Sequence, residues 1–375
     1  MIHLVLTLDY EIFGSGAGDV LRDIVEPTNR ILDLCDRYSA VLTIMFEVGE
    51  YWAFREAEEQ GLLRLDYSPA GEMEQQARRA IAHGHDVQLH LHPQWLAATL
   101  DGGIWRLRHD LWRFPDLPHG LGSRDDRLSM TGALWQGRQT LERLLTPVRP
   151  AYRCRAFRAG GFFLQPAAGA IRAMRSAGIV ADSSVVPGYW SESPWRVDYR
   201  RAPADQSYWW SSADDVASVG ALGTHILELP VFSRNGRYWN TFKWARLRPA
   251  LKRARLEQRD AHSRVKGAAR STPSPMSVLR KLISTRAITV DFCKLSAADM
   301  LHAVGAAVDA VQRSAGSTVP LVMIGHSKDF WNDRHFESFL RGMETLDHFN
   351  GQVTFDSMDG VVGRILRQEH LRQVA

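Results

Sequence analysis

The chain has 375 residues, of which 45% are hydrophobic and 23% are charged, and its formal net charge at pH 7 is +4. This composition supplies a sizeable apolar core and excludes a chain that is disordered throughout. The three cysteines, Cys35, Cys154 and Cys293, are too few and too scattered for a disulfide framework or a cysteine-rich zinc site.

Short apolar runs alternate with amphipathic segments along most of the chain. The pattern predicts strands at residues 4–8, 41–46, 86–90, 153–157, 179–181, 226–231, 320–324 and 352–355, and helices at 28–38, 72–82, 133–145, 165–177 and 297–312. Strand and helix alternating about seven times predicts a mostly parallel sheet with helical crossovers. The natural closure is an α/β barrel, formed by one domain over 1–375 with a rim or lid insertion at about 96–150.

Polar residues follow the ends of these predicted strands. In chain order they are Asp9, Glu11, His90, His92, Arg158, Asp182 and His326. Because the C-terminal ends of parallel strands meet at one edge of a barrel, we expect these side chains to converge there.

Their spacing within each strand points to a metal centre. Residues i and i+2 of a strand face the same side, so Asp9 and Glu11 can face one pocket, as can His90 and His92. Two imidazoles and one carboxylate make a three-ligand set with an open position, which suits catalytic zinc or a similar divalent ion. A second carboxylate that does not bind the metal can serve as general base. The alternative is a histidine pair that only forms hydrogen bonds or faces solvent.

The order and spacing of these residues resemble those of the NodB-homology polysaccharide deacetylases, carbohydrate esterase family four. Residues 7–11, Thr-Leu-Asp-Tyr-Glu, are similar to the family's Thr-apolar-Asp-Asp motif, and residues 84–90 are similar to its Gly-His-Glu-Ile-x-x-His motif. The family has its second metal histidine four residues after the first, where this chain has Gln94, so His92 would replace it. The resemblance implies a deformed (β/α) barrel and metal-dependent de-N-acetylation of amino sugars.

The resemblance also implies a role for each residue. Asp9 would be the base and Arg158 would orient it, while the metal ligands would be Glu11, His90 and His92. His326 would be the general acid that protonates the departing amine, because an amine anion is a poor leaving group. The alternative for His326 is a buried histidine bonded to the backbone.

Three further residues are candidates for substrate contact. Asp182 loosely matches a fourth-motif aspartate of the family. Trp95 and Trp190 belong to an unusually large set of twelve tryptophans, whose flat rings either stack on sugars or pack in the core.

The charge is unevenly distributed along the chain. Residues 231–290 contain fifteen lysines and arginines and two acidic residues, a local charge of +13, so the remainder carries −9. We interpret about 233–295 as a basic insertion, with a helix at 244–258 interrupted by Pro249 and a linker at 270–275. This insertion is either a solvent-exposed surface loop without a partner or a contact surface for an anionic partner.

The leading hypothesis is therefore a zinc-dependent deacetylase of bacterial surface polysaccharide, including lipopolysaccharide, synthesis. No basic leader or membrane-length apolar run is visible, so we expect a cytoplasmic enzyme acting on a small or lipid-linked saccharide. The basic insertion is expected to contact an anionic membrane peripherally, and nucleic acid is not an expected partner. Two alternatives are a metal hydrolase of another non-peptide C–N bond, such as a formamide or cyclic amide, and a non-catalytic saccharide-binding homologue.

Overall fold

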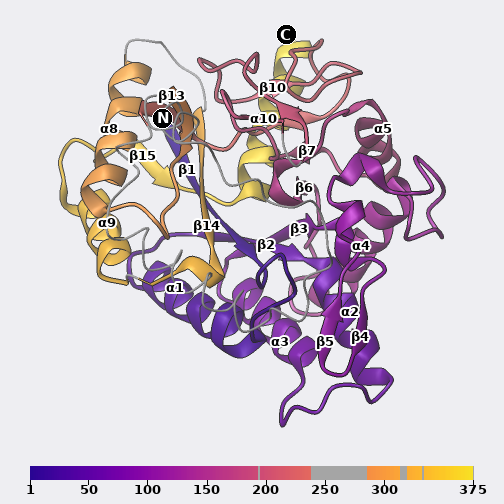
Figure 1. The fold of residues 1–375 in the computed structure, drawn as a ribbon. Coiled ribbons are helices and arrows are strands. Elements are labelled where there is room, and N and C mark those ends of the chain that lie inside the picture. The colour runs from indigo at the N-terminus through magenta and orange to yellow at the C-terminus, as the bar shows by residue number, and fades with distance from the viewer. Residues whose placement is uncertain (193–194, 238–284, 313–318, 332, 375) are drawn as a thin grey trace, which may run out of the picture.

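A curled sheet of nine strands forms the centre of the protein in the computed structural model, which describes residues 1–192, 195–237, 285–312, 319–331 and 333–374 (Figure 1). Its strands are β1 (Ile2–Tyr10), β2 (Leu42–Glu47), β3 (Asp86–Leu91), β6 (Ala156–Ala159), β7 (Ala181–Asp182), β10 (Trp209–Trp210), β11 (Leu227–Glu228), β14 (Val319–His326) and β15 (Val353–Phe355). Their order is β10-β11-β7-β6-β3-β2-β1-β14, and β15 also pairs with β1. Within this sheet the pairing of β10 with β11 is antiparallel and every other pairing is parallel, so the predicted mostly parallel sheet is confirmed.

The chain that follows β11 joins the two ends of this sheet. Val231 forms a parallel bridge with Val322 of β14, and Asp291 forms another with Ile324. The backbone N–H of Phe232 donates to the carbonyl of Val322 over 2.8 Å. These contacts curl the sheet on itself, which agrees with the predicted deformed (β/α) barrel.

Helices connect the strands and cover the outer face of the sheet, except the last one, which packs against the inner face. They are α1 (Glu26–Arg37), α2 (Val48–Glu59), α3 (Pro69–Ala82), α4 (Met130–Leu145), α5 (Ala168–Ala177), α8 (Ala297–Gln312), α9 (Asp333–Thr345) and α10 (Met358–Val374). Short helical turns lie between them: η1 (Leu21–Val25), η2 (Pro93–Trp95), η3 (His109–Leu111), η4 (Phe114–Asp116), η5 (Gly160–Phe162) and η8 (Ser327–Asp329). None of the helices in the described residues combines the length and hydropathy needed to cross a membrane.

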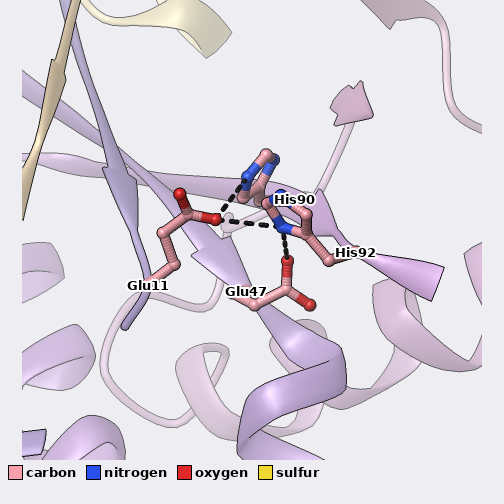
Figure 2. A group of neighbouring side chains, drawn as sticks. All are labelled: Glu11, Glu47, His90 and His92. Carbon is pink, nitrogen blue, oxygen red and sulfur yellow. Dashed lines mark hydrogen bonds and ion pairs between the residues drawn. The ribbon is translucent and has the colours of Figure 1, made fainter. Parts of the chain in front are cut away.

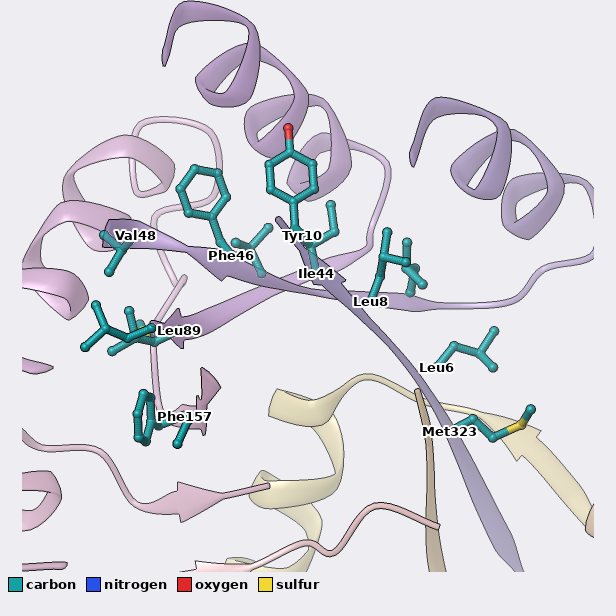
Figure 3. Packing of buried hydrophobic residues seen from close by; sticks show 14 of the residues in the cluster. Leu6, Leu8, Tyr10, Ile44, Phe46, Val48, Leu89, Phe157 and Met323 are labelled. Carbon is teal, nitrogen blue, oxygen red and sulfur yellow. The ribbon is translucent and has the colours of Figure 1, made fainter. Parts of the chain in front are cut away.

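The alternation of side chains along β1 separates an outer core from the barrel interior. Leu6, Leu8 and Tyr10 point toward the helices, where the Tyr10 ring stacks on Phe46 with centroids 5.3 Å apart (Figure 3). Val5 points the other way and packs with residues of β6, β7 and β11 against α10. The N-terminal half of the barrel interior is thus apolar and filled by α10, and Asp9 continues this inner face toward the C-terminal edge.

Three segments extend from the barrel. The predicted rim at about 96–150 contains the hairpin of β4 (Thr99–Asp101) and β5 (Ile104–Arg106), followed by η3 and η4, while its last part is the barrel helix α4. A second hairpin is formed by β8 (Trp190–Ser191) and β9 (Val197–Asp198). In the basic insertion, β12 (Ser233–Arg237) pairs antiparallel with β13 (Thr285–Thr289). The helix predicted at 244–258 and the linker at 270–275 lie outside the described residues.

Candidate metal and catalytic site

Four buried side chains converge at the C-terminal edge of the sheet. Glu11 directly follows β1, Glu47 ends β2, His90 lies in β3 and His92 directly follows β3. Each offers one ligand atom, and these four atoms all lie within 4.8 Å of one another (Figure 2). Two carboxylates and two imidazoles at this spacing could bind a metal ion.

Glu11 and His92 lie at the centre of this group. Oε2 of Glu11 lies 2.9 Å from Nδ1 of His92 and 3.3 Å from Nε2 of His90. Burial by itself lowers the pKa of His92. The carboxylates of Glu11 and Glu47 outweigh this effect and raise that pKa well above its usual value. A proton on His92 thus offsets part of the negative charge that the two carboxylates bring into the barrel.

His90 is oriented by the backbone of the neighbouring strand. Its Nδ1 lies 2.9 Å from the carbonyl oxygen of Arg158, which can only accept, so Nδ1 carries the proton. Nε2 then presents a lone pair to the group, and within the described residues it has no hydrogen-bond partner. A histidine whose other ring nitrogen donates to a backbone carbonyl is the usual arrangement of a metal ligand.

Asp9 lies beside the group and is paired with Arg158. Nη1 of Arg158 is 2.6 Å from Oδ1 of Asp9, and the guanidinium is completely buried. The other oxygen, Oδ2, lies 3.7 Å from Nε2 of His326 and 4.0 Å from Nε2 of His90. Burial raises the pKa of Asp9, but Arg158 and then the two imidazoles together lower it by more than burial raises it. The net shift is downward, so the carboxylate is ionised.

His326 ends β14 and faces two aspartates. Its Nε2 faces Asp9, and its Nδ1 lies 3.6 Å from Oδ2 of Asp291. Lys294 is paired with Asp291 over 2.9 Å and with Asp329 over 2.7 Å. Burial raises the pKa of Asp291, yet Lys294 and His326 together hold it well below its ordinary value. His326 therefore lies between two carboxylates that are both ionised.

A second lysine fixes Glu11. Nζ of Lys328 donates to Oε1 of Glu11 and, over 2.9 Å, to the carbonyl oxygen of Ile12. Burial raises the pKa of Glu11, but His92 and Lys328 lower it well below its usual value. Because Oε1 is engaged by the lysine, Oε2 is the oxygen that faces the two histidines.

The three predicted substrate residues differ in how exposed they are. Trp95 is 2% exposed and packs against Phe54 and Trp105, so it belongs to the core. Asp182 is completely buried and accepts from the hydroxyl of Ser184 over 2.8 Å. Trp190 is 37% exposed.

Sequence reasoning missed four members of the site: Glu47, Asp291, Lys294 and Lys328. Glu47 follows a correctly placed apolar strand at the same edge of the sheet, which is the signal that could have found it. Lys328 lies two residues after His326 in a segment already identified as polar. Asp291 reaches the site through an isolated bridge to β14 rather than through a strand of its own, and the sequence pattern contains no sign of that bridge.

The residues present fit a divalent cation. Asp9 is paired with Arg158 and Glu11 with Lys328, whereas the ion-pair partner of Glu47 among the described residues is His92, which is charged only while it holds a proton. A buried carboxylate needs a counter-charge, and a cation could supply it in place of that proton. Nε2 of His90, which has no hydrogen-bond partner among the described residues, adds a lone pair that could bind a metal at the same point.

No family model and no curated protein matches the sequence. Among solved structures, a protein from Mycobacterium smegmatis named as a polysaccharide deacetylase is 14% identical with a TM-score of 0.43, covering 98% of this chain and 91% of that chain. An allantoinase, Puue, is 12% identical with a TM-score of 0.40, covering 96% and 88%. A GH57-type branching enzyme from Pyrococcus horikoshii is 11% identical with a TM-score of 0.47, covering 96% and 70%. At these low identities and TM-scores, the activity has to be argued from the residues of the site.

Proposed function

We propose that this protein is a metal-dependent hydrolase that removes the N-acetyl group from an amino sugar. The observation that carries the proposal is the position of Asp9, ionised, between a buried ligand group and the imidazole of His326. The ion, which we take to be zinc, would be bound by Glu11, His90 and His92, and it would acidify a water molecule and polarise the acyl carbonyl.

Asp9 is suited to the role of general base. Its Oδ1 is engaged by Arg158 over 2.6 Å, while Oδ2 faces the site. A carboxylate whose pKa is lowered by a guanidinium is ionised at neutral pH and ready to accept a proton. The proton of the attacking water would move to Oδ2 of Asp9.

His326 is suited to the role of general acid. Nε2 lies 3.7 Å from Oδ2 of Asp9 and Nδ1 lies 3.6 Å from Oδ2 of Asp291, so a carboxylate oxygen faces each ring nitrogen, and Nζ of Lys294 lies 3.5 Å from Nδ1. A proton on Nε2 can be given to the departing nitrogen. An acid in this position supports C–N cleavage in particular, because an amine leaves only after protonation.

The choice of an N-acetyl amino sugar within this reaction class follows the resemblance of the motifs to the NodB-homology deacetylases. We place the substrate on the cytoplasmic side of bacterial surface polysaccharide synthesis, as a small or lipid-linked saccharide. The basic insertion would bring the enzyme to an anionic membrane that carries such a lipid.

Product analysis tests this proposal. Zinc-loaded protein should release acetate and a free amine in equal amounts from N-acetylglucosamine oligosaccharides, and a chelator should abolish the release. Formate released from a formamide, or ring opening of a cyclic amide, in place of acetate release would assign a different C–N hydrolase. Saccharide binding without turnover by the metal-loaded protein would contradict an enzyme altogether.

A further inference from the structure

Glu47 approaches the metal group with one oxygen and the backbone with the other. Its Oε1 accepts from the N–H of Gly49 over 2.9 Å, at the start of α2. Its Oε2 lies 2.9 Å from Nδ1 of His92, which is also 2.9 Å from Oε2 of Glu11 (Figure 2). An imidazole nitrogen carries at most one hydrogen and cannot donate it well to two carboxylates at once.

The orientation of the His92 ring decides which nitrogen faces this group. A Cβ atom on Gly160 would lie 2.7 Å from Nε2 of His92 and 2.3 Å from its Cδ2. The edge of the ring formed by Cγ, Cδ2 and Nε2 therefore lies against the backbone of Gly160, and the absence of a side chain there makes room for the ring. Nδ1 is the nitrogen directed at the two carboxylates.

We propose that Glu47 is a fourth protein ligand of the metal, through Oε2, and that His92 binds the metal through Nδ1. A cation among Oε2 of Glu11, Oε2 of Glu47, Nδ1 of His92 and Nε2 of His90 satisfies all four atoms, which a single proton on His92 does not. The proposal rests on the proposed function only in requiring that the site binds a divalent ion. It leaves one position fewer for water and substrate than the three-ligand set expected from the sequence.

The competing role for Glu47 is to orient His92 by a hydrogen bond without touching the metal. Glu47→Gln separates the two roles, because glutamine keeps a hydrogen-bonding group for the imidazole but is a far poorer ligand than a carboxylate. Glu47→Asp is the second variant, since it keeps the negative charge and withdraws the oxygens by one methylene. Glu50→Gln is the matched control: Glu50 is a buried glutamate one turn along α2 that accepts from the N–H of Ile12 over 3.0 Å and is outside the ligand group.

The experiment measures binding of Zn²⁺ and Co²⁺ alone to the full-length protein, by competition with a chromophoric chelator, and records the visible absorption of the cobalt form. Loss of an orienting partner typically weakens metal binding by about 10–100-fold. We expect Glu47→Gln and Glu47→Asp to weaken it by more than about 100-fold and to alter the cobalt bands. Glu50→Gln should bind as the wild type does.

The outcomes separate this inference from the proposed function. Equal affinity in Glu47→Gln, or a loss of no more than about 100-fold with an unchanged cobalt spectrum, would overturn the assignment of Glu47 while leaving a three-ligand metal hydrolase intact. A wild-type protein that binds neither ion would overturn the assignment and the proposed function together. Circular dichroism of each variant shows whether a lost affinity reflects a lost ligand or a lost fold, and Glu47→Asp decides if Glu47→Gln does not fold.

Discussion

Arg158 donates to Asp9 over 2.6 Å at a depth where neither side chain is more than 5% exposed. The guanidinium is itself fixed by Ser183, because Nε donates to the serine carbonyl over 2.9 Å and Nη2 donates to its hydroxyl over 3.1 Å. A charge-assisted bond of this length keeps the carboxylate ionised and restricts its rotation. Oδ2 of Asp9 is consequently the oxygen available for proton transfer.

Asp9→Asn should separate the base from the metal ligands. The amide can still accept from Arg158 but cannot take a proton from water, so we expect turnover to fall by about 10²–10⁴-fold. Metal content, measured by elemental analysis after dialysis, should match the wild type, while His90→Ala protein should lose its metal. If Asp9→Asn lost the metal and Glu11→Gln kept it, the roles of the two carboxylates would have to be exchanged.

His326→Ala should discriminate between leaving groups. An amine must be protonated to depart, so amide hydrolysis should fall by about 10²–10⁴-fold, whereas an activated aryl acetate needs no acid and should lose much less. The matched control is His83→Ala, because His83 is half-exposed after α3 at the opposite end of the sheet and bonds only to Asp36 among the described residues. Equal losses with both substrates would remove His326 from the role of acid.

The barrel strands other than β10 (Trp209–Trp210) were predictable because their apolar runs are long enough to be buried on both faces, whereas β10 was not predicted. The prediction at 4–8 corresponds to β1 (Ile2–Tyr10) and that at 320–324 to β14 (Val319–His326). Helix α2 was missed because its first turns, residues 48–54, are buried almost continuously and show no helical period. Periodicity marks a helix with one solvated face, and α2 lacks such a face at its start.

The site was predictable only where its residues follow recognisable strands. Asp9, Glu11, His90 and His92 do converge, since i and i+2 spacing is a local property of a strand. Trp95 shows the limit of the same reasoning: its place after a strand end suggested a ligand contact, but its ring is enclosed by other aromatic rings. The direction of a side chain in a turn depends on tertiary packing that a sequence pattern does not contain.

Asp86 should make stability depend on pH in the acidic range. Burial and then the carboxylate of Asp359 raise the pKa of Asp86 to about 6, whereas an unfolded chain gives about 3.9. Between these values the folded state binds the proton more tightly, so the free energy of unfolding should decrease as pH rises from about 4 to about 6, by roughly 2–3 kcal/mol. Above pH 6 this contribution is constant.

Urea unfolding of Asp86→Asn across this range checks the expectation. Asparagine does not titrate, so the difference in free energy of unfolding between wild type and variant should change by roughly 2–3 kcal/mol between about pH 4 and pH 7. The wild type should be relatively more stable at the lower pH. Asp214→Asn, at an exposed position, serves as the control and should show no such shift. A constant difference between Asp86→Asn and wild type at every pH would contradict the raised pKa.

The basic segment can be removed at a defined point. β12 and β13 pair with Arg237 opposite Thr285, so a two-residue Asn-Gly turn could replace residues 238–284 and close the hairpin. That deletion removes twelve lysines and arginines and two acidic residues, a charge of +10. The barrel strands and the ligand group lie outside the deleted range.

We expect the intact protein, but not the deleted one, to float with vesicles containing phosphatidylglycerol at low salt. Each basic residue near such a surface contributes about 1 kcal/mol, and the attraction falls off within a Debye length of about 8 Å at physiological ionic strength, so binding should weaken steeply as salt rises. Vesicles of neutral lipid should bind neither protein. Release of acetate from a small soluble saccharide should survive the deletion, because Asp9, His326 and the four metal-ligand candidates all lie outside the deleted range. Equal flotation of the two proteins, or flotation of neither at low salt, would show that the segment does not bind membranes.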